Sequence, residues 1–242
     1  MSDVEQHGNR DVWQKVGAFD RKGMKMRVVK AGVCLLICLS GIQPSFAALM
    51  IGDTVSVQHQ GLDPYTYAFG TMPVQPGLLK LGLIHLDVDG IQMEGFCIGI
   101  TQVANHNVQP YTVMDLMDAP DPGGPMGADA AMGIMKTWSW YQASSKDAFA
   151  AATAQSVIWE LTDDGNFSTG DFQLYTGPVK VAAQDLWNSL SNLTDYTPMV
   201  ALSSSRYQDY VVPLPPIPAP GAIVLGSIGM VALSWFRRKN LC

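Results

Sequence analysis

Two short apolar segments, one near each end of the chain, most constrain how these 242 residues can fold. They are residues 31–42 and 221–236, and basic residues flank both of them. Such segments are typical of export signals and membrane anchors rather than of a globular core. The stretch between them, residues 48–212, is therefore the part that forms the folded domain, and its length suits one domain.

The charges of the chain are divided unevenly between this middle part and the two ends. Residues 48–212 hold 17 acidic and 5 basic residues, a difference of −12, although the whole chain carries only −6. The other 10 basic residues comprise 7 before residue 48 and 3 after residue 212. An acidic domain repels phosphate backbones, so we expect no nucleic-acid partner.

The first apolar segment has the organisation of a secretory signal peptide. Basic residues within 24–30 precede it, and Ser45-Phe46-Ala47 offers small residues at both positions that a signal peptidase reads. We therefore predict a signal peptide over residues 24–47, with Ala48 as the first mature residue. Residues 1–23 are then an upstream extension from a misassigned start, true initiation lying at Met24 or Met26. An uncleaved anchor helix is the alternative.

The second apolar segment follows a proline-rich spacer and predicts a single transmembrane helix over residues 221–236. Arg237, Arg238 and Lys239 follow it and would stop it on the cytoplasmic side. A plain single-pass anchor is one interpretation of residues 213–242.

The same segment, with Pro218-Ala219-Pro220 before the helix and Arg237-Arg238 after it, resembles the PEP-CTERM sorting domain of Gram-negative bacteria. The resemblance covers only residues 213–242. It implies an exosortase-like membrane enzyme as a partner. It also implies an intermediate anchored in the inner membrane, and a final place at the cell surface or in the extracellular matrix.

The pattern of the middle part indicates an α+β fold, with a β-rich, sandwich- or barrel-like domain that carries a small helical portion. The composition after a loop over residues 119–125 is helical, and Ser144 with Asp147 resembles a capping box. Alternating or apolar runs predict strands over residues 53–57, 65–69, 79–88, 91–102, 196–201 and 207–212, and helices over 146–161 and 179–190.

Cys97 is the residue of the middle part that first suggests chemistry. Exported proteins usually pair their cysteines. Here Cys34 and Cys38 leave with the signal peptide and Cys242 lies beyond the membrane segment, so Cys97 has no partner within the domain. On its predicted strand Cys97 points to the face opposite Phe96, Ile98 and Ile100. An unpaired cysteine in an exported domain is worth explaining.

Gln155 is the second such residue. On its predicted helix it shares a face with Ala151, Ala152, Ile158 and Trp159. An amide on an apolar face is costly unless its polar atoms are bonded. Gln155 must therefore either form hydrogen bonds or have reacted.

Phe96-Cys97-Ile98 and Thr153-Ala154-Gln155-Ser156-Val157-Ile158-Trp159 together resemble the thioester domains of bacterial surface adhesins. The resemblance implies that the Cys97 sulfur and the Gln155 carbonyl form an internal thioester with loss of ammonia, and that Phe96 and Trp159 form its environment. A target amine, such as a lysine, would then attack the thioester and become covalently bound. Such a single-use adhesin is not a conventional enzyme and needs no cofactor.

Two other functions remain open at this point. A non-reactive structural protein of an exopolysaccharide or biofilm matrix would use the same scaffold. A secreted hydrolase would need a nucleophile, and a Cys97–His106 pair has no supporting local motif, while lone histidines such as His59 and His85 are more often structural. No Gly-x-Ser-x-Gly elbow, P-loop or metal-type His/Cys spacing is present in the sequence.

Overall fold

The computed structural model describes residues 49–121 and 124–214. The upstream extension (1–23), the signal peptide (24–47) and the transmembrane helix (221–236) predicted from the sequence lie outside the described residues, as do Pro218, Ala219, Pro220, Arg237 and Arg238. Within the described ranges, no helix has both the length and the apolar character needed to span a membrane.

The described part contains nine strands and three α-helices, and the helices lie between β6 and β8 in the sequence. The strands are β1 (Thr54–Thr71), β2 (Gly77–Val88), β3 (Ile91–Cys97), β4 (Gln109–Asp115), β5 (Pro120–Asp121), β6 (Gly124–Pro125), β7 (Gln173–Leu174), β8 (Met199–Ser203) and β9 (Tyr210–Pro213). The helices are α2 (Ala128–Ala143), α3 (Ala148–Leu161) and α4 (Pro178–Ser189), with short 3-10 turns η1 (Leu116–Asp118) and η2 (Leu190–Asn192). This confirms the expected α+β, sheet-rich domain with a small helical portion.

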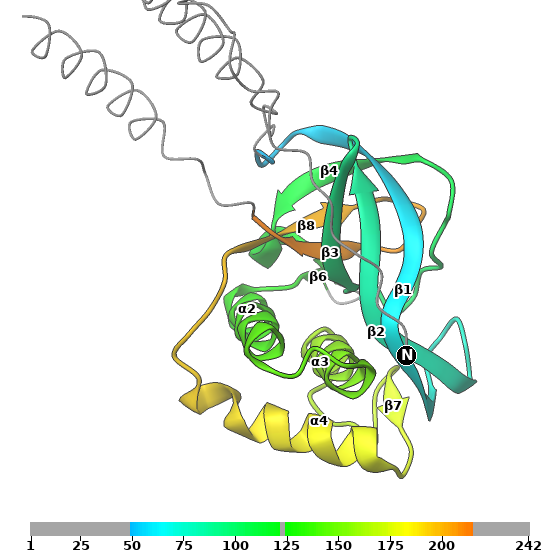
Figure 1. Ribbon diagram of the computed structural model, residues 1–242, viewed down its shortest axis with the longest axis vertical. Coiled ribbons are helices and arrows are strands. Elements are labelled where there is room, and N and C mark those ends of the chain that lie inside the picture. Colours follow the sequence, from blue (N-terminus) through cyan, green and yellow to red (C-terminus); the bar gives the residue numbers. More distant parts are fainter. Residues whose placement is uncertain (1–48, 122–123, 215–242) are drawn as a thin grey trace, which may run out of the picture. The chain divides into compact units, whose positions relative to one another are not determined.

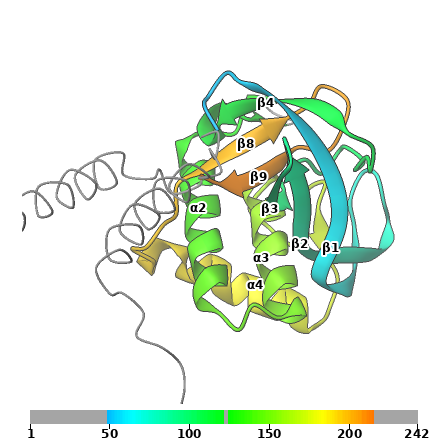
Figure 2. The same cartoon turned by 45° about the horizontal axis from the view of Figure 1, so that its top comes forward.

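Six antiparallel strands pair in a closed ring, in the order β1-β2-β3-β9-β8-β4 and back to β1. The ring closes because β1 is long enough to serve two neighbours. Its residues 54–57 pair with β4, and its residues 57–70 pair with β2. Each strand of the ring thus has a paired neighbour on both sides over part of its length. Figure 2 shows β1 crossing the front of the sheet between β4 and β2.

Helix α3 is the central helix of the described part. It packs against β1, β2, α2 and α4, and Figure 1 shows it between the sheet and α4. Every side chain from Ala150 to Glu160 is buried. A helix that is covered all round belongs to the core, and the small alanine side chains let its neighbours approach closely. Any polar residue on α3 must therefore find its partners inside the protein.

Several predicted strand boundaries were wrong. The last two strands begin at Met199 and Tyr210 instead of at residues 196 and 207. The segments predicted as separate strands at 53–57 and 65–69 belong to the single strand β1, whose pairing with β2 continues past two irregularities between His59 and Tyr65. Strand β3 ends at Cys97 instead of continuing to residue 102. Beyond that end the alternation fails, so Ile100 packs in the same apolar cluster as Cys97, while Phe96 and Ile98 pack in the other.

The capping box was also misplaced. Asp147 itself is the N-cap of α3, because its carboxylate accepts a hydrogen bond from the Ala150 N–H at 2.8 Å. Ser144 instead ends the preceding helix α2, which the sequence did not delimit. Strand β4 was likewise not predicted, and the loop at 119–125 contains the short β5–β6 pair.

Candidate functional site

Cys97 lies at the end of β3 where this strand no longer pairs with β2. It is the last residue of β3 and faces Tyr210 across the β3–β9 pair. On its other side the pairing of β2 with β3 stops at Ile84 and Gly95, two residues before Cys97. The backbone N–H and C=O of Cys97 thus have no strand partner on the β2 side.

The side chain of Gln155 takes the place of the missing strand. The Cys97 N–H donates to Gln155 Oε1 at 3.1 Å, and Gln155 Nε2 donates to the Cys97 carbonyl at 2.8 Å. Both residues are buried, and Cys97 forms no disulfide. Buried backbone groups need partners, and one amide here supplies both. The fold therefore brings the two predicted residues into contact from segments 58 residues apart.

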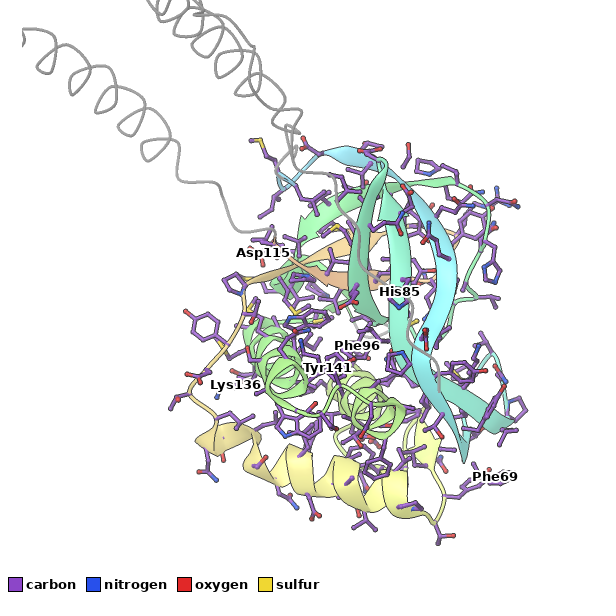
Figure 3. The ribbon with its side chains drawn as sticks, in the orientation of Figure 1. Phe69, His85, Phe96, Asp115, Lys136 and Tyr141 are labelled. Carbon is purple, nitrogen blue, oxygen red and sulfur yellow. The ribbon has the colours of Figure 1, made fainter. Side chains whose placement is uncertain are left out.

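The two residues predicted as the environment of the pair lie on different sides of β3. Phe96 points toward α2, where its ring meets Trp138 at 5.7 Å and Tyr141 at 5.5 Å between centroids. Figure 3 shows Phe96 beside Tyr141. Trp159 instead borders the cavity next to Cys97 and packs edge-on against Phe172. Only Trp159 of these two shares a cavity with the pair.

A cavity of about 400 Å³ adjoins the Cys97–Gln155 pair. Both residues line it, together with groups from β1, β2, the segment after β3 and the segment before β9. Its titratable side chains, besides Cys97, are His59, Lys80 and His106. The pair is therefore buried within the protein but faces a space that a small ligand can fill.

Burial sets the protonation state of the groups around the cavity. It raises the pKa of the Cys97 thiol far above its ordinary value, so the thiol keeps its proton at neutral pH. Burial, followed by the charges of His106 and Lys80, lowers the pKa of His59 to about 4. His59 is consequently a neutral imidazole at neutral pH, able to accept a proton but not to provide a positive charge.

Tyr210 links Cys97 to the two histidines. Its hydroxyl lies 3.3 Å from Nδ1 of His59, and the two rings stack at 5.8 Å. The His59 ring in turn meets the His106 ring edge-on at 4.8 Å. No local sequence pattern predicts this arrangement, because the three residues come from β1, β9 and the segment between β3 and β4.

Glu160 is the buried acidic residue of α3. It is 1% exposed, and neither of its carboxylate oxygens has a hydrogen-bond partner. Burial, reinforced by the nearby Asp164 and Asp163, raises the pKa of Glu160 to about 8. The carboxyl group is therefore mainly protonated at neutral pH.

The described residues contain no group of three or more His, Cys, Asp or Glu side chains placed to hold a metal ion. Comparison with known proteins gave no match to any protein-family model, to any curated protein or to any solved structure.

Proposed function

We propose that the chain is an exported cell-surface or extracellular-matrix protein in which Cys97 and Gln155 form an internal thioester that binds a ligand covalently. The observation that carries this proposal is the double hydrogen bond between the Gln155 amide and the Cys97 backbone. It holds the electrophilic carbon of one side chain beside the residue that bears the thiol. Such positioning is the main requirement for an otherwise unreactive amide.

The bond-forming step balances without any further reactant. The Cys97 sulfur attacks Cδ of Gln155, the Sγ–Cδ bond forms and the Cδ–Nε2 bond breaks. The thiol proton moves to Nε2, which leaves as ammonia. Negative charge that develops on Oε1 during the attack is stabilised by the Cys97 N–H, which already donates to that oxygen at 3.1 Å.

Covalent binding then consumes the thioester. A nucleophile of the ligand attacks Cδ, the Sγ–Cδ bond breaks, and the nucleophile's proton returns to the Cys97 sulfur. The ligand stays attached to Gln155 and the thiol is released. Because each molecule reacts once, this is an adhesin and not an enzyme, and the reaction uses no cofactor.

The routing part of the proposal depends on the ends of the chain. The signal peptide at 24–47 and the sorting tail at 213–242 support export, a membrane-anchored intermediate and handling by an exosortase-like enzyme. The acidic middle part supports a ligand other than nucleic acid. The ligand would be a component of another cell surface or of a polysaccharide matrix.

A non-reactive matrix protein on the same scaffold is the second candidate, and one observation favours it. Gln155 already satisfies two buried backbone groups at the end of β3, which is a sufficient structural reason for an amide at this position. In that case Cys97 is a buried, inert thiol.

Methylamine separates the two candidates. The full chain is incubated with methylamine, digested, and the peptide that contains Gln155 is weighed. The thioester predicts that Gln155 becomes a methylamide in the wild type and stays unmodified in a Cys97→Ala variant. An unmodified Gln155 in both proteins supports the non-reactive matrix protein.

A further inference from the structure

The cavity beside the Cys97–Gln155 pair differs in charge from the rest of the domain. Residues 48–212 carry 17 acidic and 5 basic residues. Among the described residues that line the cavity, none is Asp or Glu, and the one with a permanent charge is Lys80. The ammonium group of Lys80 lies over the Tyr65 ring, 3.8 Å from its centroid. The cavity is thus neutral to positive within an acidic domain.

This charge disfavours an amine as the natural nucleophile. A lysine side chain is protonated in water, since its pKa is about 10.4. On entering the cavity its ammonium group would lose its hydration and find no carboxylate among the lining residues. It would also meet the positive charge of Lys80. An uncharged hydroxyl group loses no hydration of a charge and is not repelled by Lys80.

A hydroxyl group needs help that a free amine does not, because it must lose its proton as it attacks. His106 lines the same cavity as Gln155 and can give this help. Its Nδ1 lies 3.0 Å from the backbone carbonyl of His59. A carbonyl can only accept a hydrogen bond, so Nδ1 donates the proton in this contact. Nε2 is therefore the ring nitrogen that can accept a proton when the imidazole is neutral.

We infer that this cavity accepts an uncharged hydroxyl group of a polyol or carbohydrate, with His106 as the base that takes its proton. The inference rests on the proposed thioester and names the substrate class for it. The hydroxyl oxygen attacks Cδ of Gln155, its proton passes to Nε2 of His106, and an O–Cδ ester bond forms. The Sγ–Cδ bond breaks, and the proton is returned from His106 to the Cys97 sulfur.

The test compares glycerol, a neutral polyol, with methylamine on the full chain. The wild type, a His106→Gln variant and a control His85→Gln variant are each incubated with each probe. His85 is a suitable control because its ring binds the Asp63 carbonyl and it does not line the cavity. Mass spectrometry of the Gln155 peptide then gives the rate at which each adduct forms.

We expect glycerol ester on Gln155 in the wild type and in His85→Gln. In His106→Gln the glycerol rate should fall by at least about tenfold, since general base catalysis commonly contributes more than this. The methylamine rate should fall much less, because the free base of an amine attacks without assistance. His106 is exposed, so this substitution does not disturb the core.

Two kinds of failure are distinguishable. A wild type that reacts with methylamine but forms no glycerol ester overturns this inference and leaves the thioester intact. If glycerol ester forms at equal rates in the wild type and in His106→Gln, His106 is not the base, and the thioester is again left intact. A wild type that reacts with neither probe overturns the proposed function together with this inference.

Discussion

Gln155 and Glu160 are two of the buried polar side chains of helix α3, and their surroundings differ. Gln155 makes one hydrogen bond through each of its polar atoms, both to the backbone of Cys97. Glu160 has neither carboxylate oxygen paired. The difference follows from what lies opposite each residue. Gln155 faces the open end of β3, which needs a donor and an acceptor, whereas Glu160 lies near the acidic residues Asp163 and Asp164.

The comparison shows why burial alone does not identify a functional residue. Both the oxygen and the nitrogen of the Gln155 amide are hydrogen-bonded to the Cys97 backbone. Its carbonyl carbon therefore has a defined position relative to Cys97. Glu160 is instead kept mainly neutral, because its burial raises its pKa to about 8. We therefore expect Gln155 to matter for both structure and chemistry, and Glu160 to matter for the dependence of stability on pH.

The largest expected effect comes from Gln155→Ala, made in a Cys97→Ala background so that no thioester contributes. The substitution leaves the N–H and C=O of residue 97 buried and unpaired, each costing about 1–3 kcal/mol, and removes buried side-chain volume as well. We expect the free energy of unfolding to fall by about 4–5 kcal/mol in total. Urea unfolding of the purified proteins, followed by tryptophan fluorescence, measures it.

Gln92→Ala in the same background is the matched control, because Gln92 is exposed and bonds only to Asp87. Gln92→Ala should change the free energy of unfolding by no more than about 0.5 kcal/mol. A similarly small effect of Gln155→Ala would show that the amide does not hold the end of β3 in solution.

A smaller effect is expected at Glu160. Its pKa is about 8 in the folded protein and near the ordinary value of 4.5 when unfolded. The folded state therefore binds more protons between these values, so the contribution of Glu160 to stability declines as pH rises through that window. Glu160→Gln removes this decline, and the variant should gain on the order of a few kcal/mol over the wild type between pH ~4.5 and ~8.

The comparison must use the difference between variant and wild type at each pH. Asp209, whose pKa is raised to about 6 by burial, and His59 also change the stability of both proteins in the acidic range. Unfolding curves for the two proteins measured from pH 4 to 9 supply the difference. A difference that does not change with pH would show that Glu160 is ionised in the folded protein.

Much of the local structure could be predicted from the sequence, because it depends on neighbouring residues. The β2–β3 hairpin followed from two apolar runs around Asp89-Gly90, and α3 from its alanine-rich composition. The boundaries were less predictable. Pro64 and Gly61 interrupt the pattern within β1, yet the strand continues because β2 pairs with it on both sides of the interruption.

The candidate site was predictable only in part. Cys97 and Gln155 have local signals, an unpaired cysteine and an amide on an apolar helix face. His59, His106 and Tyr210 have none, because they meet only through the closure of the strand ring and the pairing of β3 with β9. The position of Phe96 depended on which face of β3 meets α2, and a single strand pattern does not determine that.

The mass of the untreated protein shows whether Cys97 and Gln155 are joined by a thioester. The full chain and its Cys97→Ala variant are digested under mildly acidic conditions, and the peptides that contain residues 97 and 155 are weighed. We expect that in the wild type these two peptides are joined and together lack the mass of one ammonia, whereas in Cys97→Ala they are separate and complete. Two separate peptides of full mass in the wild type, with Cys97 as a free thiol, would contradict it.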